Sequence, residues 1–333
     1  MKKIGILFGE ENGVPGALVE CINARNQKGI VAEFVQVGAV SADRPSDYTV
    51  LVDRISHEVP FYRAWLKQAA LQGVSILNDP FRASVSDRFL NGIVAARAGV
   101  AVPPTVLLPH KQHPGRTSAG SLRNLEYPLD WEGVFATVGE HGYLKPIHGG
   151  NQDVYEVHSR DEFFAAYDAS GTHGMIYQQA VPCTAYFRCY VVGQKKVRVM
   201  ACDPHRPHQE RSLSDSAPEV GKPLLKRIEQ DAIRLSTALG YDVNCVEFAV
   251  QDEALYAVDF TNPVPDADEN SVGAEHHEWF VHAVADLAIA RAKAAHGSPA
   301  STWFDPAAPV AEAAAPEAPQ AAPKKAARKR AGK

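Results

Sequence analysis

The sequence has few cysteines and no long hydrophobic run. Its five cysteines are scattered, odd in number and without CxxC spacing: Cys21, Cys183, Cys189, Cys202 and Cys245. This favours free thiols in a reducing compartment over disulfides or a zinc site. No run approaches the roughly 18 apolar residues of a membrane span. The N-terminal sequence MKKIGILFGEENG has too few apolar residues before its acids for a signal peptide and fits a first strand. We therefore expect a cytoplasmic protein with no membrane partner.

Two common nucleotide motifs are also missing. Residues 9–13 lack the GxGxxG spacing of a dinucleotide site, and the KPxxGG sequence from Lys145 lacks the spacing of a P-loop. No Ser-His-Asp or Cys-His arrangement indicates a covalent nucleophile. These absences exclude P-loop NTPases and leave room for a phosphate site of another kind.

The charge is small overall but unevenly placed. The net charge is −5, whereas the segment from Asp305 carries three acids and six bases, which leaves −8 for the rest of the chain. Such a body does not attract polyanions non-specifically, so a phosphate site must be local. The tail from Pro306 has too few large apolar residues to offset the entropy of ordering and is expected to be disordered. Its basic end allows weak contact with nucleic acid, but a solubilising extension is the favoured interpretation.

Residues 1–80 alternate strands and helices, which predicts a mostly parallel sheet covered by helices. Strands are expected at Lys3–Phe8, Val31–Val37, Tyr48–Val52 and Val74–Leu77, and helices at Ala17–Asn26 and Phe61–Leu71. Arg54 follows the end of a strand, where ligands often lie in such sheets. An ordinary surface or ion-pairing arginine is the favoured interpretation.

The remaining chain contains more strands and three strong helix signals. A capping-box-like start at Ser84 to Asp87 opens a helix that stops at Gly99, and a last helix covers His277–Ala295. Pro223 begins a helix over Lys222–Leu239 that ends at Gly240 and carries an apolar stripe: Leu224, Ile228, Ala232, Leu235 and Leu239. A further capping box, Ser159 to Glu162, opens a short helix through Phe163, Phe164 and Tyr167. Residues 110–126 are loop-like. Strands are expected at the segment with Lys145, at the segment before Val157, and at Met175–Val181, Tyr186–Val192, Lys196–Cys202, Val243–Val250 and Leu255–Phe260.

The last two of these strands form a hairpin with one acid in each apolar run, Glu247 and Asp259. Side chains alternate between the two faces of a strand, so the register decides whether the acids meet. A three-residue loop (Asp252, Glu253, Ala254) places Glu247 opposite Asp259, whereas a two- or four-residue loop places them on opposite faces. Paired carboxylates repel unless they share a cation, and Asn262 offers a third hard oxygen ligand for Mg²⁺. The alternative is that one acid points to solvent.

Three further segments carry candidate anion-binding residues. Lys145 stands beside the flexible pair Gly149-Gly150, and glycines let backbone N–H groups approach phosphate oxygens. Arg188 is flanked on one strand face by Tyr186 and Tyr190, which indicates either an anion-binding arginine or a surface arginine stacked on tyrosines. The loop Asp203–Arg211 has two histidines but no further zinc ligands at suitable spacing, so an anion-binding arginine at 206 or 211 is favoured there.

The order of these parts resembles the ATP-grasp superfamily, in particular the branch of glutathione synthetases and the ligases that add glutamate to a ribosomal protein. The resemblance covers residues 1–295 and implies an α/β (α+β) fold: an N-terminal parallel α/β domain and two α+β subdomains that clasp ATP. It implies a pre-ATP-grasp domain over 1–80 and an ATP-grasp domain over 81–300, with a smaller lobe at 110–182. The disordered tail is then 301–333.

The resemblance also implies roles for individual residues. Arg88 stands where the family usually has a phosphate-contacting lysine, Lys145 matches the second such lysine, and Gly149 and Gly150 match the loop that closes over the phosphates. Gln178, Gln179 and Val181 match the hinge that reads the adenine edge. Arg188 and, with weaker alignment, Arg211 match the two arginines that bind the transferred phosphoryl group. Glu247, Asp259 and Asn262 match the three metal ligands. The family's Glu-x-Asn is one residue longer here, so Thr261 is an alternative to Asn262.

The implied activity is that of an ATP- and Mg²⁺-dependent ligase. It would activate a small-molecule or peptide carboxylate as an acyl phosphate for attack by an amine or thiol, with a homodimer as one arrangement. The alternatives are a phosphoryl transferase on the same fold and a nucleotide-binding regulatory protein without catalysis. The sequence does not identify the two substrates.

Overall fold

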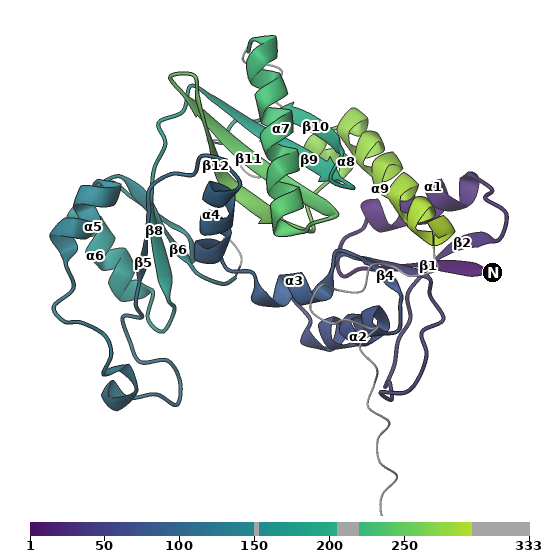
Figure 1. Ribbon diagram of the computed structural model, residues 1–333, viewed down its shortest axis with the longest axis horizontal. Helices are drawn as coiled ribbons and strands as arrows, with labels where there is room; N and C mark the ends of the chain where they lie inside the picture. The colour runs from purple at the N-terminus through teal and green to yellow at the C-terminus, as the bar shows by residue number, and fades with distance from the viewer. Residues whose placement is uncertain (150–152, 205–219, 295–333) are drawn as a thin grey trace, which may run out of the picture.

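The computed structural model describes residues 1–149, 153–204 and 220–294, which form three four-stranded sheets with helices packed on them (Figure 1). This is the mixed α/β fold that was expected. The predicted tail, 301–333, lies outside the described residues. Within the described ranges, none of the helices combines the length and hydrophobicity of a membrane span.

The first sheet is parallel, with strand order β2-β1-β3-β4. Its strands are β1 (Lys2–Leu7), β2 (Ile30–Phe34), β3 (Val50–Asp53) and β4 (Ser75–Leu77). Helix α2 (Pro60–Leu71) covers one face through Trp65 and Leu66. Helices α1 (Val14–Ala24) and α9 (Ala274–Ala294) pack on the other face, so the last described helix closes the core of the first sheet.

The second sheet is antiparallel, with strand order β5-β8-β6-β7. Its strands are β5 (Thr105–Leu108), β6 (Gly142–Pro146), β7 (Tyr155–Val157) and β8 (Met175–Gln179). Helices α5 (Trp131–Val138) and α6 (Arg160–Ala169) cover one face with an aromatic cluster around Phe163. Among the residues described in this lobe, no helix covers the opposite face, and Lys145, Ile176 and Gln178 on that face line a cavity.

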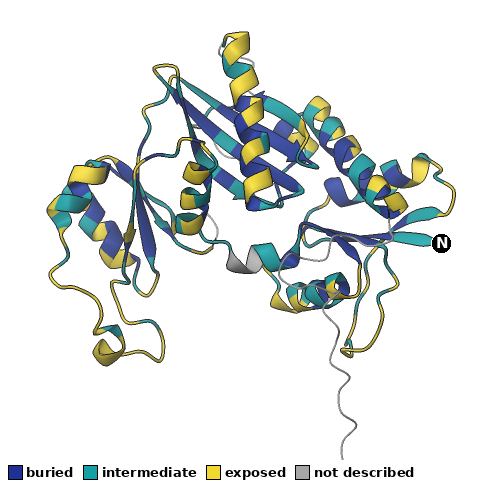
Figure 2. Ribbon diagram, viewed as in Figure 1, coloured by how far each residue is buried: buried dark blue, intermediate teal, exposed yellow. Residues whose placement is uncertain are grey.

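The third sheet is antiparallel, with strand order β10-β9-β11-β12. Its strands are β9 (Ala185–Val192), β10 (Lys196–Ala201), β11 (Val243–Gln251) and β12 (Ala254–Asn262). Helix α7 (Lys222–Leu239) buries its predicted apolar stripe against this sheet beside α4 (Arg88–Arg97), and α9 packs against the other side (Figure 2). Gly240 ends α7 with φ +75°, a conformation that glycine adopts without strain.

The positions of the predicted strands and helices are confirmed with small shifts at their ends, but two details are wrong. A short helix, α3 (Pro80–Val85), occupies the segment that was expected to begin the next helix, and Asp87 caps α4 by accepting from the Leu90 N–H at 2.6 Å. Helix α5 was not predicted. Two further short helices, η1 (Ala119–Leu122) and α8 (Glu269–Val272), complete the described elements.

Candidate functional site

Glu247 lies opposite Asp259 across β11 and β12, as expected, but the predicted three-residue loop is wrong. The turn has two residues, Asp252 and Glu253, both with positive φ (47° and 67°). A regular ladder from that turn would pair Glu247 with Val258. The register instead shifts by one residue after the Phe248–Ala257 pair, so Val258 is the extra residue of a β-bulge and Asp259 faces Glu247.

A second register shift brings Asn262 to the same face. Asn262 pairs with Cys245, two residues before Glu247, although it lies three residues after Asp259. Directly paired residues share a face of an antiparallel ladder. The shift therefore absorbs the extra residue of the Asp259–Asn262 segment, and Asn262, not Thr261, follows the register of the two acids.

Arg188 completes a row across three neighbouring strands, because it pairs with Glu247 in the β9–β11 ladder. Its Nε lies 3.9 Å from Glu247 Oε1 and donates to Cys245 Sγ at 3.2 Å. The guanidinium also stacks on the Tyr190 ring, with 5.6 Å from Cζ to the ring centroid. Arg188 is only 2% exposed. The interpretation as a surface arginine stacked on tyrosines is therefore right about the stacking and wrong about the surface position.

Tyr186 holds the other oxygen of Glu247. Its hydroxyl donates to Glu247 Oε2 at 2.6 Å. Burial raises the pKa of Tyr186 well above its ordinary value, and the nearby negative charge of Glu247 raises this pKa further. The phenol therefore stays protonated and orients the carboxylate.

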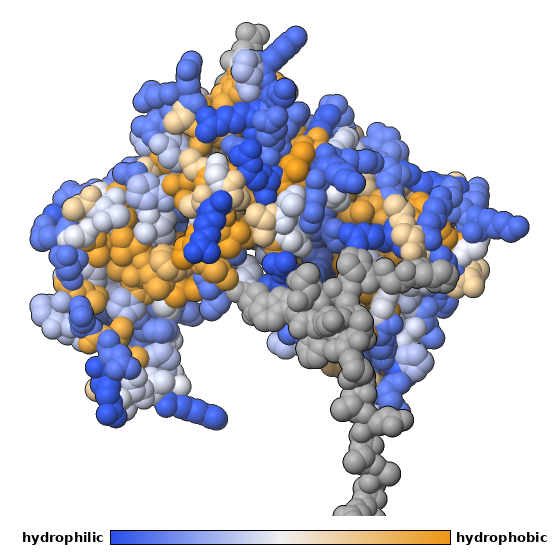
Figure 3. All heavy atoms as spheres, in the orientation of Figure 1, coloured by the Kyte–Doolittle hydropathy of each residue, from blue (hydrophilic) through white to orange (hydrophobic). Residues whose placement is uncertain are grey.

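A cavity of about 280 Å³ lies beside this row, between α4, the open face of the second sheet and the bulge of β12. It is slightly below the range of about 300–1,000 Å³ that is usual for ligand pockets. Hydrophobic residues gather around α4 and the second sheet on the face seen in Figure 3. Most of the lining is apolar, and its charged or strongly polar members include Arg88, Lys145, Gln178 and Asp259.

Two cations enter this cavity from different elements. Lys145 on β6 donates from Nζ to Gln178 Oε1 at 2.9 Å and to the Val258 carbonyl at 3.4 Å. Arg88, the first residue of α4, donates from Nη1 to the Pro146 carbonyl at 2.6 Å. Arg88 and Lys145 therefore line one cavity together with Asp259.

Burial lowers the pKa of both cations. For Lys145, burial lowers the pKa most, Asp259 counters it, Arg88 lowers the pKa further, and Glu247 raises it. For Arg88, burial lowers the pKa and Asp259 counters it. Two desolvated cations that repel each other form a site where an added polyanion is stabilising.

The other expected nucleotide-binding residues are placed less uniformly. The Gln178 side chain lines the cavity, but its backbone lies inside the sheet between β5 and β6. The Gln179 N–H donates to the Pro104 carbonyl at 2.9 Å, and Val181 follows the end of β8. Gly149 has φ +111°, which only glycine adopts easily. Gly150 and Arg211 lie outside the described residues.

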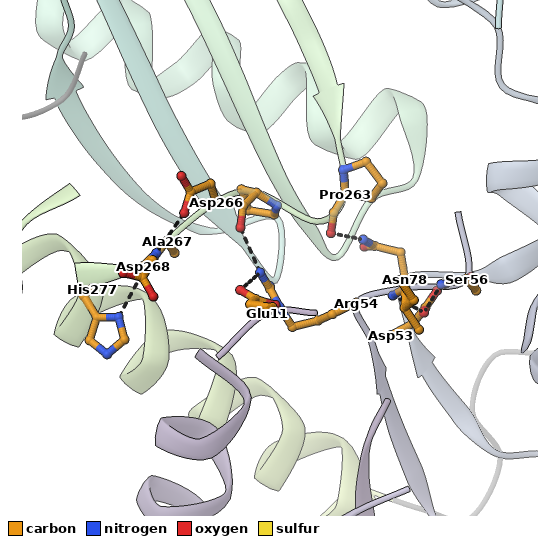
Figure 4. A network of polar contacts seen from close by, with 12 residues as sticks. Glu11, Asp53, Arg54, Ser56, Asn78, Pro263, Asp266, Ala267, Asp268 and His277 are labelled. Carbon is orange, nitrogen blue, oxygen red and sulfur yellow. Dashed lines mark hydrogen bonds and ion pairs between the residues drawn. The ribbon is translucent and has the colours of Figure 1, made fainter. Parts of the chain in front are cut away.

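The loop after β12 is held by residues whose importance the sequence did not reveal (Figure 4). Arg54 donates from Nη2 to the Pro265 carbonyl at 2.9 Å and pairs with Glu11, with Nη2 to Oε1 at 2.6 Å. The ion pair was expected, but the surface position is wrong because Arg54 is 5% exposed. Its place just after a parallel strand was the available signal.

Asn78 and the tyrosine-flanked arginine anchor the same loop. Asn78 Nδ2 donates to the carbonyls of Val243 (2.9 Å) and Pro263 (3.2 Å). The Asp266 carbonyl accepts from Arg188 Nη2 at 3.2 Å and from the Tyr190 hydroxyl at 2.5 Å. The end of β12 is thus fixed from the first and the third sheets, which keeps Asp259 and Asn262 in register with Glu247.

No protein-family model and no curated protein matches the sequence. Solved structures do match the fold over nearly their whole length. An ATP-grasp RimK domain protein from Sphaerobacter thermophilus is 18% identical, with 86% of this chain and 98% of that chain covered and a TM-score of 0.62. The D-alanine–D-alanine ligase from Bacillus anthracis, complexed with ATP, is 12% identical, with 88% and 97% covered and a TM-score of 0.60.

A third similar structure is a complex with a precursor. The ATP-grasp ligase PsnB, complexed with a minimal precursor, Mg and ADP, is 13% identical, with 87% of this chain and 98% of that chain covered and a TM-score of 0.56. At these identities the likeness concerns the fold, and the reaction has to be argued from the residues of this chain.

Proposed function

Because this chain has the ATP-grasp fold, we propose that it is an ATP- and Mg²⁺-dependent ligase that activates a substrate carboxylate for attack by an amine or thiol. We place it nearest the branch of the glutathione synthetases and the ribosomal-protein-glutamylating ligases. The observation that carries this proposal is the meeting of two cations, Arg88 and Lys145, with Asp259 at one cleft, where Glu247 is paired with Asp259 and its charge acts on Lys145. Cations bind phosphates and paired acids bind the accompanying metal, so this combination suits a nucleotide triphosphate with Mg²⁺.

The residues of the third sheet fit a magnesium ion. Glu247, Asp259 and Asn262 share one face of the β11–β12 ladder and offer hard oxygens. When bound, Mg²⁺ would neutralise charge on the phosphates that react. Tyr186 and Arg188 hold Glu247 from the side away from Asp259, so the carboxylate is oriented before the ion arrives.

Different residues of the cleft would bind the phosphates and the base of the nucleotide. Lys145, Arg88 and the loop with Gly149 and Gly150 would bind the phosphates. The apolar cavity walls beside Gln178 suit a flat base, with Val181 as the hinge residue whose backbone contacts its edge. Since the Gln179 N–H already donates within the sheet, Gln179 would contribute through another group.

The reaction then needs no side-chain nucleophile. A substrate carboxylate oxygen attacks the γ-phosphorus, ADP departs, and an acyl phosphate forms. The amine or thiol attacks the acyl carbon, phosphate departs, and the nucleophile loses its proton to solvent. Arg188 and Arg211 would offset the charge that develops on the transferred phosphoryl group.

The other parts of the proposal concern organisation and substrates. We assign residues 1–80 to a pre-ATP-grasp domain and 81–300 to the ATP-grasp domain, with a cytoplasmic location and a homodimer as one arrangement. The carboxylate belongs to a small molecule or a peptide, in keeping with the similar structures, one of which is complexed with a precursor peptide.

Trapping with hydroxylamine tests the proposal. ADP release is measured over a panel of amino acids and acidic peptides, with hydroxylamine in place of the acceptor, and Lys145→Met is the inactive control. Formation of a hydroxamate supports an acyl phosphate. A stable phosphorylated product would indicate a phosphoryl transferase instead, and ATP binding without turnover on the whole panel would favour a regulatory protein.

A further inference from the structure

Two histidines, a glutamate and a tyrosine lie together on the open face of the second sheet, at the end of the β6–β7 ladder. Tyr143 pairs directly with Glu156, and the register places His141 opposite His158 one step beyond the Gly142–Val157 pair. Residues two apart on a strand point to the same face. All four side chains therefore lie on one face, opposite the face that carries α5 and α6.

The two histidines and the glutamate are close enough to bind one metal ion together. One ligand atom from each of His141, Glu156 and His158 lies within 4.8 Å of the other two. His141 Nε2 lies 3.1 Å from Glu156 Oε1, and His158 Nε2 lies 4.0 Å from the same oxygen. An ordinary surface ion pair needs only two groups, whereas here two imidazoles converge on one carboxylate.

The backbone on both sides of the cluster is fixed by hydrogen bonds. The His141 carbonyl accepts from the Ala180 N–H at 3.1 Å, and the His158 N–H donates to Glu162 Oε2 at 2.8 Å. The two imidazole rings lie 4.4 Å apart between centroids. An ion would therefore require only small side-chain rotations, because the strands already hold the three ligands together.

The chemistry of this set differs from that of the β11–β12 site. Two imidazole nitrogens and one carboxylate oxygen are a typical ligand set for Zn²⁺ and related transition ions, whereas Mg²⁺ prefers oxygen alone. The side chains of His141, Glu156 and His158 are 48%, 46% and 60% exposed, so water can complete the coordination.

Tyr143 supplies an outer contact of the kind that tunes metal ligands. Its hydroxyl donates to Glu156 Oε1 at 3.1 Å. Burial raises the pKa of Glu156, but the hydrogen bonds from His141 and Tyr143 outweigh it and hold this pKa below its ordinary value.

We propose that His141, Glu156 and His158 form a binding site for a divalent transition-metal ion, with Zn²⁺ as the ion to test. This site lies outside the proposed ligase chemistry and uses none of its residues. Tyr143 links the two regions, because its ring lies 5.4 Å from the Lys145 ammonium.

Zinc titration of the full-length protein tests the site. The titration is made by calorimetry in excess Mg²⁺, on a background in which His205→Ala and His208→Ala remove another pair of closely spaced histidines. We expect one bound Zn²⁺, weakened about 100-fold by His141→Ala or His158→Ala, and about 10-fold by Tyr143→Phe, within the range seen for contacts that support metal ligands. Bound Co²⁺ should give absorption bands that disappear in Glu156→Gln.

His282→Ala is the matched control, because His282 is an exposed histidine on α9, far along the chain from the β6–β7 ladder. It should leave Zn²⁺ affinity and the Co²⁺ spectrum unchanged. Equal Zn²⁺ affinity in the background protein and in its His141→Ala/His158→Ala derivative would overturn the proposal. Loss of ATP turnover with intact Zn²⁺ binding would affect the proposed ligase function only.

Discussion

Glu247 on β11 lies opposite Asp259 on β12, although the turn that joins these strands has only two residues. A bulge at Val258 corrects the register and brings the two acids to one face. Each acid has a cation at hand: Arg188 lies 3.9 Å from Glu247, and the charge of Asp259 is felt by Lys145 and Arg88. The repulsion between the acids is therefore reduced before any ligand binds, and the sheet can keep two metal-binding groups side by side.

Glu247→Gln should abolish Mg²⁺-dependent turnover while preserving the fold. The substitution removes one charge but keeps an oxygen that can accept from Tyr186. We expect ADP formation to fall about 100-fold or more, the size of losing one electrostatic contact with the transition state. The measurement is ADP release as a function of Mg²⁺ concentration, together with the midpoint of thermal unfolding.

Glu253→Gln provides the matched control for that substitution. Glu253 lies in the turn of the same hairpin and is exposed, so the same chemical change there should leave turnover unchanged. Turnover of Glu247→Gln close to that of the unaltered protein would remove Glu247 from the proposed metal site.

Asp259→Asn should lower the pKa of Lys145. Burial already lowers this pKa from its ordinary value, and the negative charge of Asp259 counters that effect. Without the charge, the ammonium loses its proton at a lower pH. ATP affinity measured without divalent metal should therefore decline at a lower alkaline pH in the variant than in the unaltered protein.

The shift can be observed directly by following the ¹³Cε resonance of Lys145 with pH in lysine-labelled protein. Asp252→Asn, in the turn of the same hairpin, should leave that titration in place. A Lys145 titration that moves upward in Asp259→Asn would contradict the assigned proximity of the two groups.

Much of the fold could be predicted because hydrophobic periodicity and end signals act locally. The proline in the first turn of α7 and its stop at Gly240 mark the two ends of that helix, and its apolar stripe marks the face that is buried. The alternation of strands and helices over residues 1–80 predicts the parallel sheet. Lys145, Arg88 and Asp259 also meet in one cavity as the resemblance implied. Their roles are a separate matter and rest on the proposed function.

The bulge could not be derived from turn length, because it depends on which residues the core accepts. Leu255 and Ala257 are buried in the hydrophobic core of the third sheet, and the next buried residue is Phe260, not residue 259. This change from a spacing of two to a spacing of three was the sequence signal of the bulge. The buried positions of Arg54 and Asn78 depend on α9 and the loop after β12, which lie about 200 residues further along the chain, so no local pattern revealed them.

Asn78→Ala should destabilise the protein without touching the proposed chemistry. The Asn78 side chain is 7% exposed, donates to two carbonyls and accepts from the N–H groups of Asp242 (2.6 Å) and Val243 (2.8 Å). Each buried group that loses its partner costs about 1–3 kcal/mol, so we expect the free energy of unfolding to fall by about 3 kcal/mol or more. Urea denaturation measures this, with exposed Asn124→Ala as the control. A loss under 1 kcal/mol would show that water replaces these contacts.

Arg188→Met should be more damaging than Arg188→Lys, and the two variants separate charge from geometry. The methionine removes the guanidinium that lies 3.9 Å from Glu247, and because the Glu247 side chain is 19% exposed, the loss of stability should stay below the about 3–5 kcal/mol of breaking a pair that is buried on both sides. The lysine keeps the charge but cannot reproduce both the contact with Cys245 Sγ and the bond to the Asp266 carbonyl. We therefore expect both variants to lose turnover, with Arg188→Lys close to the unaltered protein in stability and Arg188→Met less stable. Arg198→Lys on neighbouring β10 is the control, because its exposed pairing with Glu275 is of the kind that contributes only about 0–1 kcal/mol. Full turnover in Arg188→Lys would mean that the site needs only a positive charge at this position, and the fork of hydrogen bonds from the guanidinium would then have a structural role alone.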